Sequence, residues 1–392
     1  MEKILLERNI KLYYMNRFFR QFVLFLPVWA LFFQEVGLSL AQITIAATLM
    51  HVTIQILEVP SGIFADLYGR KKSVFLSALF FMLSILSYSF AYNFIHLLLG
   101  EILMGISFAF SSGAIQAMIY DSLYDLNKKN NFKKVESHSF FISGISHSIA
   151  AIIGGFIAVY SLRLTFFYTL IPGILLFLTN ILFYEPEHHK TVGDKDYLKH
   201  YKEAWNFTKK HKKILFLMFY NASYIILTLA FFIILQPYMV KVGFQLKFFG
   251  YLYAFFLFVS ALGSKFMSPI EEFLGYRKSM LLIPISTIIG ILIVFFSKSL
   301  LLSLIGISLF ELNWGFLNPL ISSYINEHLP TKYRATIISF NGFLIGIGSL
   351  IFIPLMGRLG DISLNYSFLL ILLMGIIGLA FAIRLGGKNG QN

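Results

Sequence analysis

The chain has 392 residues, of which 57% are hydrophobic and only 13% are charged, and its formal net charge is +13. Soluble domains carry about 25% charged residues, so this composition excludes an ordinary soluble globular protein. The absence of cysteine excludes disulfides, Cys-ligated zinc and thiol catalysis.

Apolar segments of membrane length follow one another along the chain. A helix of about 20 mostly apolar residues crosses a bilayer. The sequence predicts twelve such spans, at Phe18–Phe33, Ala41–Phe64, Val74–Tyr92, Phe94–Asp121, His138–Tyr160, Leu164–Tyr184, Ile214–Gln236, Lys247–Ile270, Ser279–Phe296, Leu300–Glu327, Ala335–Met356 and Ser363–Arg384. The predicted fold class is therefore an all-α membrane protein with twelve transmembrane helices.

One long polar segment interrupts these spans. It predicts an N-terminal six-helix bundle over 1–184, a cytoplasmic basic linker over 185–213 and a C-terminal six-helix bundle over 214–392. His188 and His189 lie in the linker, but two adjacent histidines lack the spacing of a ligand cage, so we predict no metal site.

The positive charge is unevenly distributed. Most of the 32 Lys and Arg fall in the segments that share a side with the N-terminus, which the positive-inside rule places in the cytoplasm. We therefore expect a multi-pass protein of the cell membrane with both termini cytoplasmic. The charge sets topology, and we do not expect nucleic-acid binding.

A short polar turn joins the second and third spans. It reads G-I-F-A-D-L-Y-G-R-K-K from Gly62 to Lys72. The sequence resembles the signature loop between the second and third helices of the major facilitator superfamily of transporters, whose conserved positions correspond here to Gly62, Asp66, Gly69, Arg70 and Lys71. The resemblance implies two pseudo-symmetric six-helix bundles with a substrate site near the midplane between them.

The two halves of the chain carry equivalent landmarks. A shift of 206 residues places three residues of the second half under three of the first, namely Glu272 under Asp66, Gly275 under Gly69 and Glu327 under Asp121. One offset that serves separate landmarks indicates an internal repeat.

Two glutamates fall well inside predicted spans. Glu101 lies about 10 Å into the fourth span and Glu311 about 16 Å into the tenth. Glu101 shares a helical face with Gly105, Phe108, Ser112 and Gln116, and Glu311 shares one with Gly315, Asn318 and Ser322. Intramembrane acids usually face a cavity and act in transport, so we predict that both line the cavity and carry protons. The alternative is a locally hydrogen-bonded residue that fixes helix packing.

Two further acids lie near the polar turn. The resemblance implies that Asp66 and Asp121 form a conformational switch with Arg70 and Lys71. The alternative for Asp121 is an exposed carboxylate at a helix end, where ion pairs contribute only about 0–1 kcal/mol. Glu58 lies eight residues before Asp66, and we predict that it lines the cavity together with Glu101 and Glu311. The surrounding sequence does not distinguish a gating role from a structural role for this residue.

The rest of the predicted cavity is mainly apolar. Asn221 and Tyr224 share a face of the seventh span, and Trp314 lies beside Glu311. Such a cavity suits lipophilic or amphipathic compounds. Small residues that resemble an exporter pattern in the fifth span also favour efflux; they are Ser146, Ala150, Ala151, Gly154 and Gly155.

These features predict a secondary active transporter rather than an enzyme. No nucleotide-binding GxxxxGK[ST] and no hydrolase motif occurs, so we expect a proton gradient as the energy source and no cofactor. We expect a monomer in the bilayer that exports small hydrophobic or amphipathic compounds by alternating access. The alternative is proton-coupled uptake of a sugar, organic acid or amino acid.

Overall fold

A computed structural model describes residues 2–187, 205–297, 299–328 and 331–385. The chain folds into two compact units, the first formed by 1–192 with 245–254 and the second by 193–244 with 255–392. Most of the predicted linker, including His188 and His189, lies outside the described residues.

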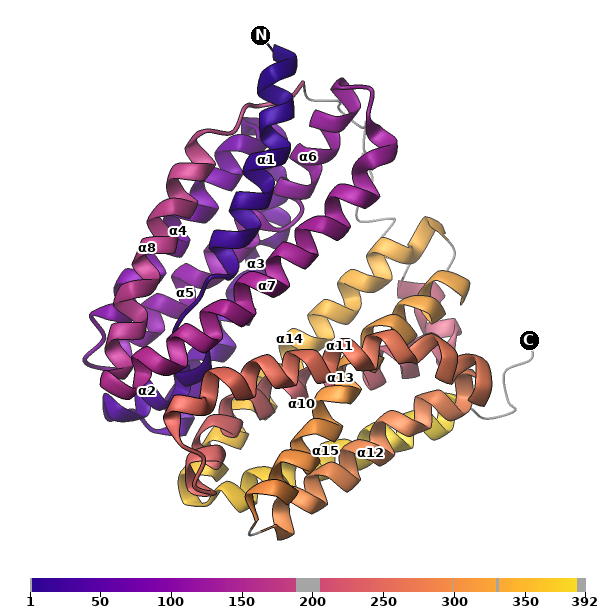
Figure 1. The fold of residues 1–392 in the computed structure, drawn as a ribbon. Coiled ribbons are helices and arrows are strands. Elements are labelled where there is room, and N and C mark those ends of the chain that lie inside the picture. The colour runs from indigo at the N-terminus through magenta and orange to yellow at the C-terminus, as the bar shows by residue number, and fades with distance from the viewer. Residues whose placement is uncertain (1, 188–204, 298, 329–330, 386–392) are drawn as a thin grey trace. The chain divides into compact units, whose positions relative to one another are not determined.

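The described part of the first unit consists of helices joined by turns and loops (Figure 1). Its helices are α1 (Glu2–Gln21), α2 (Trp29–Glu35), α3 (Leu40–Tyr68), α4 (Arg70–Ser89), α5 (Phe94–Ser111), α6 (Ala114–Asp125), α7 (Phe132–Tyr160) and α8 (Leu162–Ile181), with 3-10 turns η1 (Leu26–Val28) and η2 (Lys129–Asn131). Helix α5 packs against both α3 and α4, while α1 lies along α7 and α8.

Residues 205–210 are helical, and six longer helices follow in the described part of the chain. They are α10 (Lys212–Lys241), α11 (Phe249–Leu274), α12 (Tyr276–Phe296), α13 (Leu300–His328), α14 (Thr331–Ile362) and α15 (Leu364–Leu385), with the 3-10 turn η3 (Leu246–Phe248) before α11. The core of the second unit is built around Tyr220, Tyr224, Met280 and Leu320.

Eleven helical segments among the described residues are long and apolar enough to cross a membrane. They match every predicted span except Phe18–Phe33. Here the prediction of one continuous helix is wrong, because α1 ends at Gln21 and the chain resumes as η1 and α2. Pro27 lacks an N–H, and its ring clashes with the preceding turn of a helix.

The interruption after α1 is held by the neighbouring helices. The Leu24 N–H donates to Thr169 Oγ1 at 3.1 Å, and the Leu24 carbonyl lies so close to Gly154 that any Cβ there would clash. Ser146 on the same helix, α7, donates to the Phe18 carbonyl at 2.6 Å. The small residues of the fifth span therefore serve close packing within the first unit.

The fourth span is also interrupted. The sequence predicts one helix over Phe94–Asp121, whereas α5 ends at Ser111 and α6 begins at Ala114. Gly113 between them has φ +72°, a conformation that glycine adopts without strain. The expected face from Glu101 to Gln116 therefore does not run along one straight helix.

The two units repeat two local features. Gly69 between α3 and α4 and Gly275 between α11 and α12 both have positive φ, +105° and +76°, at the predicted offset of 206. Gly105 of α5 packs on the Met50 carbonyl of α3, and Gly315 of α13 packs on the Ser260 carbonyl of α11. Gly315 and Ser260 each follow their counterparts in the first unit by 210 residues. This offset exceeds the predicted shift of 206 by about one helical turn.

Candidate functional site

The turn that carries the transporter signature is a sharp join between two helices. Helix α3 ends at Tyr68, and the Gly69 N–H still donates to the Ala65 carbonyl at 3.1 Å. Helix α4 begins at once with Arg70. Because Gly69 has φ +105°, a residue with a Cβ would be strained there. Gly62 lies inside α3, and a Cβ at this position would meet no other atom, so position 62 can accept a side chain without strain.

The structure brings Arg70 and Asp121 together. Nη1 of Arg70 forms an ion pair with Oδ2 of Asp121, and the two side chains are only 13% and 7% exposed. The pair joins the start of α4 to the last turns of α6, which the sequence separates by 51 residues. Its burial excludes the reading of Asp121 as an exposed carboxylate.

A third group at this turn is Glu185, which sequence reasoning assigned to the linker. Its carboxylate accepts the backbone N–H groups of Arg70 at 2.8 Å and Lys71 at 2.6 Å. These N–H groups are free at the first turn of α4, where the helix dipole favours an anion. The signal available in the sequence was an acid directly after the sixth span. Asp66 itself is exposed on the last turn of α3.

Glu101 lies inside the first unit rather than on an open surface. It is 3% exposed, and its Oε1 accepts the hydroxyl of Tyr88 on α4 at 2.7 Å. Of its predicted face, Gly105 packs against α3, whereas Phe108 and Ser112 are exposed. Gln116 is partly buried near the start of α6, with an Oε1 that has no hydrogen-bond partner among the described residues.

The second acid, Glu311, is partly buried in α13, and its carboxylate makes no hydrogen bond to a described residue. Tyr224 belongs to the core of the second unit, and Trp314 packs against that core. Asn221 is 8% exposed. The Asn318 side chain lies outside what the structure describes, and Glu58 is exposed on α3.

A polar network missed by sequence reasoning joins three helices of the second unit. Asn313 Nδ2 donates to Thr287 Oγ1 at 2.9 Å, and the Asn313 side-chain oxygen accepts the Ser286 hydroxyl at 2.8 Å. The Tyr224 hydroxyl donates to the same Thr287 oxygen at 3.3 Å. Tyr224 therefore acts here through both packing and a hydrogen bond between α10 and α12.

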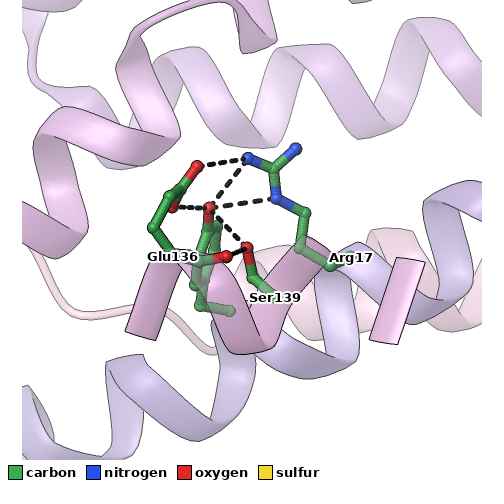
Figure 2. Close-up of polar contacts among 4 residues, drawn as sticks. Arg17, Glu136 and Ser139 are labelled. Carbon is green, nitrogen blue, oxygen red and sulfur yellow. Dashed lines mark hydrogen bonds and ion pairs between the residues drawn. The ribbon is translucent and has the colours of Figure 1, made fainter. Parts of the chain in front are cut away.

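Figure 2 shows a second unpredicted cluster, between α1 and α7. The Tyr13 hydroxyl donates to Glu136 Oε2 at 2.5 Å and accepts from Arg17 Nε and Nη2 at 3.0 and 2.8 Å. Arg17 Nη2 also lies 3.4 Å from Glu136 Oε1, and Ser139 donates to the Tyr13 oxygen at 3.3 Å. The charge of Arg17 is thus balanced by Glu136.

No group of three or more His, Asp or Glu side chains placed to hold a metal ion occurs in the described ranges. The candidate site consists instead of a charged turn at one end of the first unit and isolated acids within the helices.

Comparison with known protein families gives a match over nearly the whole chain. The sequence profile of the Major Facilitator Superfamily matches residues 12–353 and 230–388, nearly the whole length. The chain belongs to the major facilitator superfamily. It is therefore a multi-pass membrane transporter with the all-α fold of that family, as the sequence predicted.

Its relatives in this superfamily are distant. The uncharacterized MFS-type transporter YxaM of Bacillus subtilis is 23% identical over 337 residues, which cover 84% of this chain and 83% of YxaM. The quinolone resistance protein NorA of Staphylococcus aureus is 26% identical over 193 residues, 48% of each chain.

Solved structures share the fold. The nucleoside transporter NupG superimposes with a TM-score of 0.75 at 13% identity, covering 97% of this chain and 98% of NupG. A bacterial homologue of the human lysosomal transporter Spinster gives a TM-score of 0.72 at 16% identity, covering 98% and 96%.

Proposed function

We propose that this transporter couples proton movement to the efflux of small hydrophobic or amphipathic compounds by alternating access. The observation that carries the coupling is the environment of Glu101, which is 3% exposed and bonded among the described residues only by Tyr88. An ionised carboxylate in such a place is costly, and a bound proton removes the charge. Proton binding therefore favours the conformation that buries Glu101, which is the requirement for coupling.

The direction of transport rests on a different observation. NorA, whose name describes quinolone resistance, matches half of this chain at 26% identity, which supports efflux. Glu311 is proposed as the second proton-carrying acid, because it is the partly buried carboxylate of α13. Asp66, Arg70, Lys71 and Asp121 are proposed as the conformational switch.

Transport by the purified protein in proteoliposomes tests the proposal. With a pH dye inside the liposomes and an imposed proton gradient, a panel of amphipathic acids, amines and neutral compounds is screened for compound-driven proton movement. We expect opposite movement of compound and proton in the wild type, and loss of the gradient dependence in E101Q. E35Q, which neutralises an exposed acid at the end of α2, is the matched control.

Three results would contradict parts of the proposal. Full gradient-driven flux in both E101Q and E311Q would remove these acids from coupling. Movement of compound and proton in the same direction would replace efflux by uptake symport. Flux that ignores the gradient in the wild type would exclude proton coupling altogether.

A further inference from the structure

Arg20 is a cation inside the first unit that has no carboxylate partner among the described residues. It is 8% exposed at the end of α1. Its Nη1 donates to Ser77 Oγ of α4 at 2.8 Å and its Nη2 to Ser107 Oγ of α5 at 3.1 Å. The Ser107 hydroxyl donates its proton to the Ser77 carbonyl at 2.8 Å, so the Ser107 oxygen can only accept the N–H of Arg20.

Two hydroxyls do not satisfy a buried guanidinium. The group has five N–H donors, and the serines take two of them. The rings of Phe81 and Phe108 lie 5.5 and 4.9 Å from the guanidinium carbon. Such cation–π contacts offset only part of the cost of burying an ion without a counter-charge. The charge of Arg20 is therefore only partly compensated.

The neighbouring charges add to this positive potential. Arg17 lies one turn earlier on α1, and its charge is already balanced by Glu136, which also accepts the Tyr13 hydroxyl. Glu136 therefore compensates Arg17, and the charge of Arg20 has no carboxylate of its own among the described residues. The local site is thus built to accept one negative charge that the described part of the chain does not supply.

Arg20 also lies directly beneath an accessible surface. Phe108, whose ring covers the guanidinium, is 40% exposed. Ser112, one turn further on the same face, and Gly113 are exposed at the break between α5 and α6. Irregular backbone does not occur facing lipid, because its polar groups need water or protein. The break beside Phe108 therefore argues against a lipid-facing position for this face. Phe108 is the ring that separates the Arg20 guanidinium from the accessible surface.

We propose that Arg20 is the anion-recognition group of the transporter, and that its preferred compounds carry a carboxylate on an aromatic or apolar body. The planar guanidinium matches a carboxylate in shape and hydrogen bonds. Phe108 moves off the guanidinium and packs on the apolar body. This assignment rests on the proposed transport function, and it narrows the substrate class of the first unit to amphipathic acids.

Equilibrium binding to the purified full chain tests the proposal without any gradient. A panel of aromatic acids, beginning with 2-naphthoate, is compared with the matched neutral amides, beginning with 2-naphthamide, by thermal shift and calorimetry. We expect at least one acid to bind about 10-fold more tightly than its amide, a difference of about 1.4 kcal/mol. R20Q removes this preference, and R20K keeps part of it because the charge remains without the planar fork.

K11Q, which removes an exposed cation of the same helix, is the matched control and keeps the full preference. F108A keeps the acid preference and speeds association, because the covering ring is absent. If R20Q does not fold, the reduced preference of R20K decides. The proposal is overturned if no acid of the panel exceeds its amide in the wild type, or if R20Q or R20K discriminates as well as the wild type. Gradient-driven flux of neutral compounds without an acid preference would leave the proposed function standing and reject this inference alone.

Discussion

Tyr88 and Glu101 form a buried hydrogen-bonded pair between α4 and α5, and Gly100 sets their approach. The Tyr88 hydroxyl donates to Glu101 Oε1 at 2.7 Å. A Cβ at position 100 would overlap the Tyr88 ring, so glycine at this position allows the close approach of the ring to α5. Tyr88 is itself packed among Phe25, Phe33 and Phe166. The acid therefore has one hydrogen-bond donor in a fixed position.

Replacement of that donor should change the pH dependence of transport. In Y88F the ionised carboxylate of Glu101 loses its hydrogen bond, and bonds to charged groups contribute about 1.5–3 kcal/mol. We expect the pH profile of flux in Y88F to differ from that of the wild type by about one pH unit, since one unit corresponds to about 1.4 kcal/mol. Flux measured across a pH series checks this.

Y168F is the control for this change, because Tyr168 is an exposed tyrosine of α8. It should leave the pH profile where the wild type has it. A Y88F profile that coincides with that of Y168F would separate Tyr88 from proton binding.

The two glycines of the signature turn should respond differently to alanine. In G69A the new Cβ is forced into a positive-φ conformation that costs about 1–2 kcal/mol, and it also lies 3.0 Å from Glu185 Oε2. In G62A the Cβ enters open space inside a helix, which stabilises by about 0.5–1 kcal/mol. Thermal unfolding in detergent measures both. Equal melting temperatures for the two variants would show that the turn tolerates a side chain.

Much of this architecture could be predicted from the sequence, because hydropathy and charge report directly on spans. Eleven of the twelve spans and the turn at Gly69 follow from local patterns. The break after Gln21 has one local signal, Pro27. Its position also depends on Thr169 and Gly154 from distant helices, which local patterns do not reveal.

The partners of the candidate site were also outside the reach of local patterns. Arg70 was predicted as part of the switch, and Asp121 beside it, but the contact of Glu185 with the α4 N-terminus joins residues 115 apart. The serines that hold Arg20 come from two further helices. Helix faces can be read from spacing, whereas rotation and depth of each helix follow from tertiary packing.

Glu185 should stabilise the first unit through its charge. In E185Q the side chain keeps an acceptor oxygen but loses the anion at the start of α4, and such helix-dipole interactions contribute about 0.3–2 kcal/mol. We expect a lower melting temperature that falls less steeply than the wild type's when salt is added, because salt screens the lost interaction. E187Q makes the same charge change two residues later on an exposed side chain. If E187Q lowers the melting temperature equally, net charge rather than the contact with Arg70 and Lys71 is responsible.

Arg70 and Asp121 should show strong energetic coupling because their ion pair is buried. Side chains that are 13% and 7% exposed cannot recover their hydration when one partner is removed. We expect R70Q and D121N each to destabilise by about 3 kcal/mol or more, and the double variant by less than the sum. A double-mutant cycle of unfolding free energies measures this coupling.

The exposed pair Glu7–Lys128 provides the matched cycle. Its Nζ–Oε1 distance is 2.8 Å, but the side chains are 47% and 45% exposed, so their coupling should be close to zero. The hydrogen bond from Lys128, aided by its charge, lowers the pKa of Glu7 below its ordinary value. What little this pair contributes is therefore present at neutral pH and is lost as the pH falls through that lowered pKa. Coupling of the same size in both cycles would mean that burial does not strengthen the Arg70–Asp121 pair, and the switch would then need another anchor.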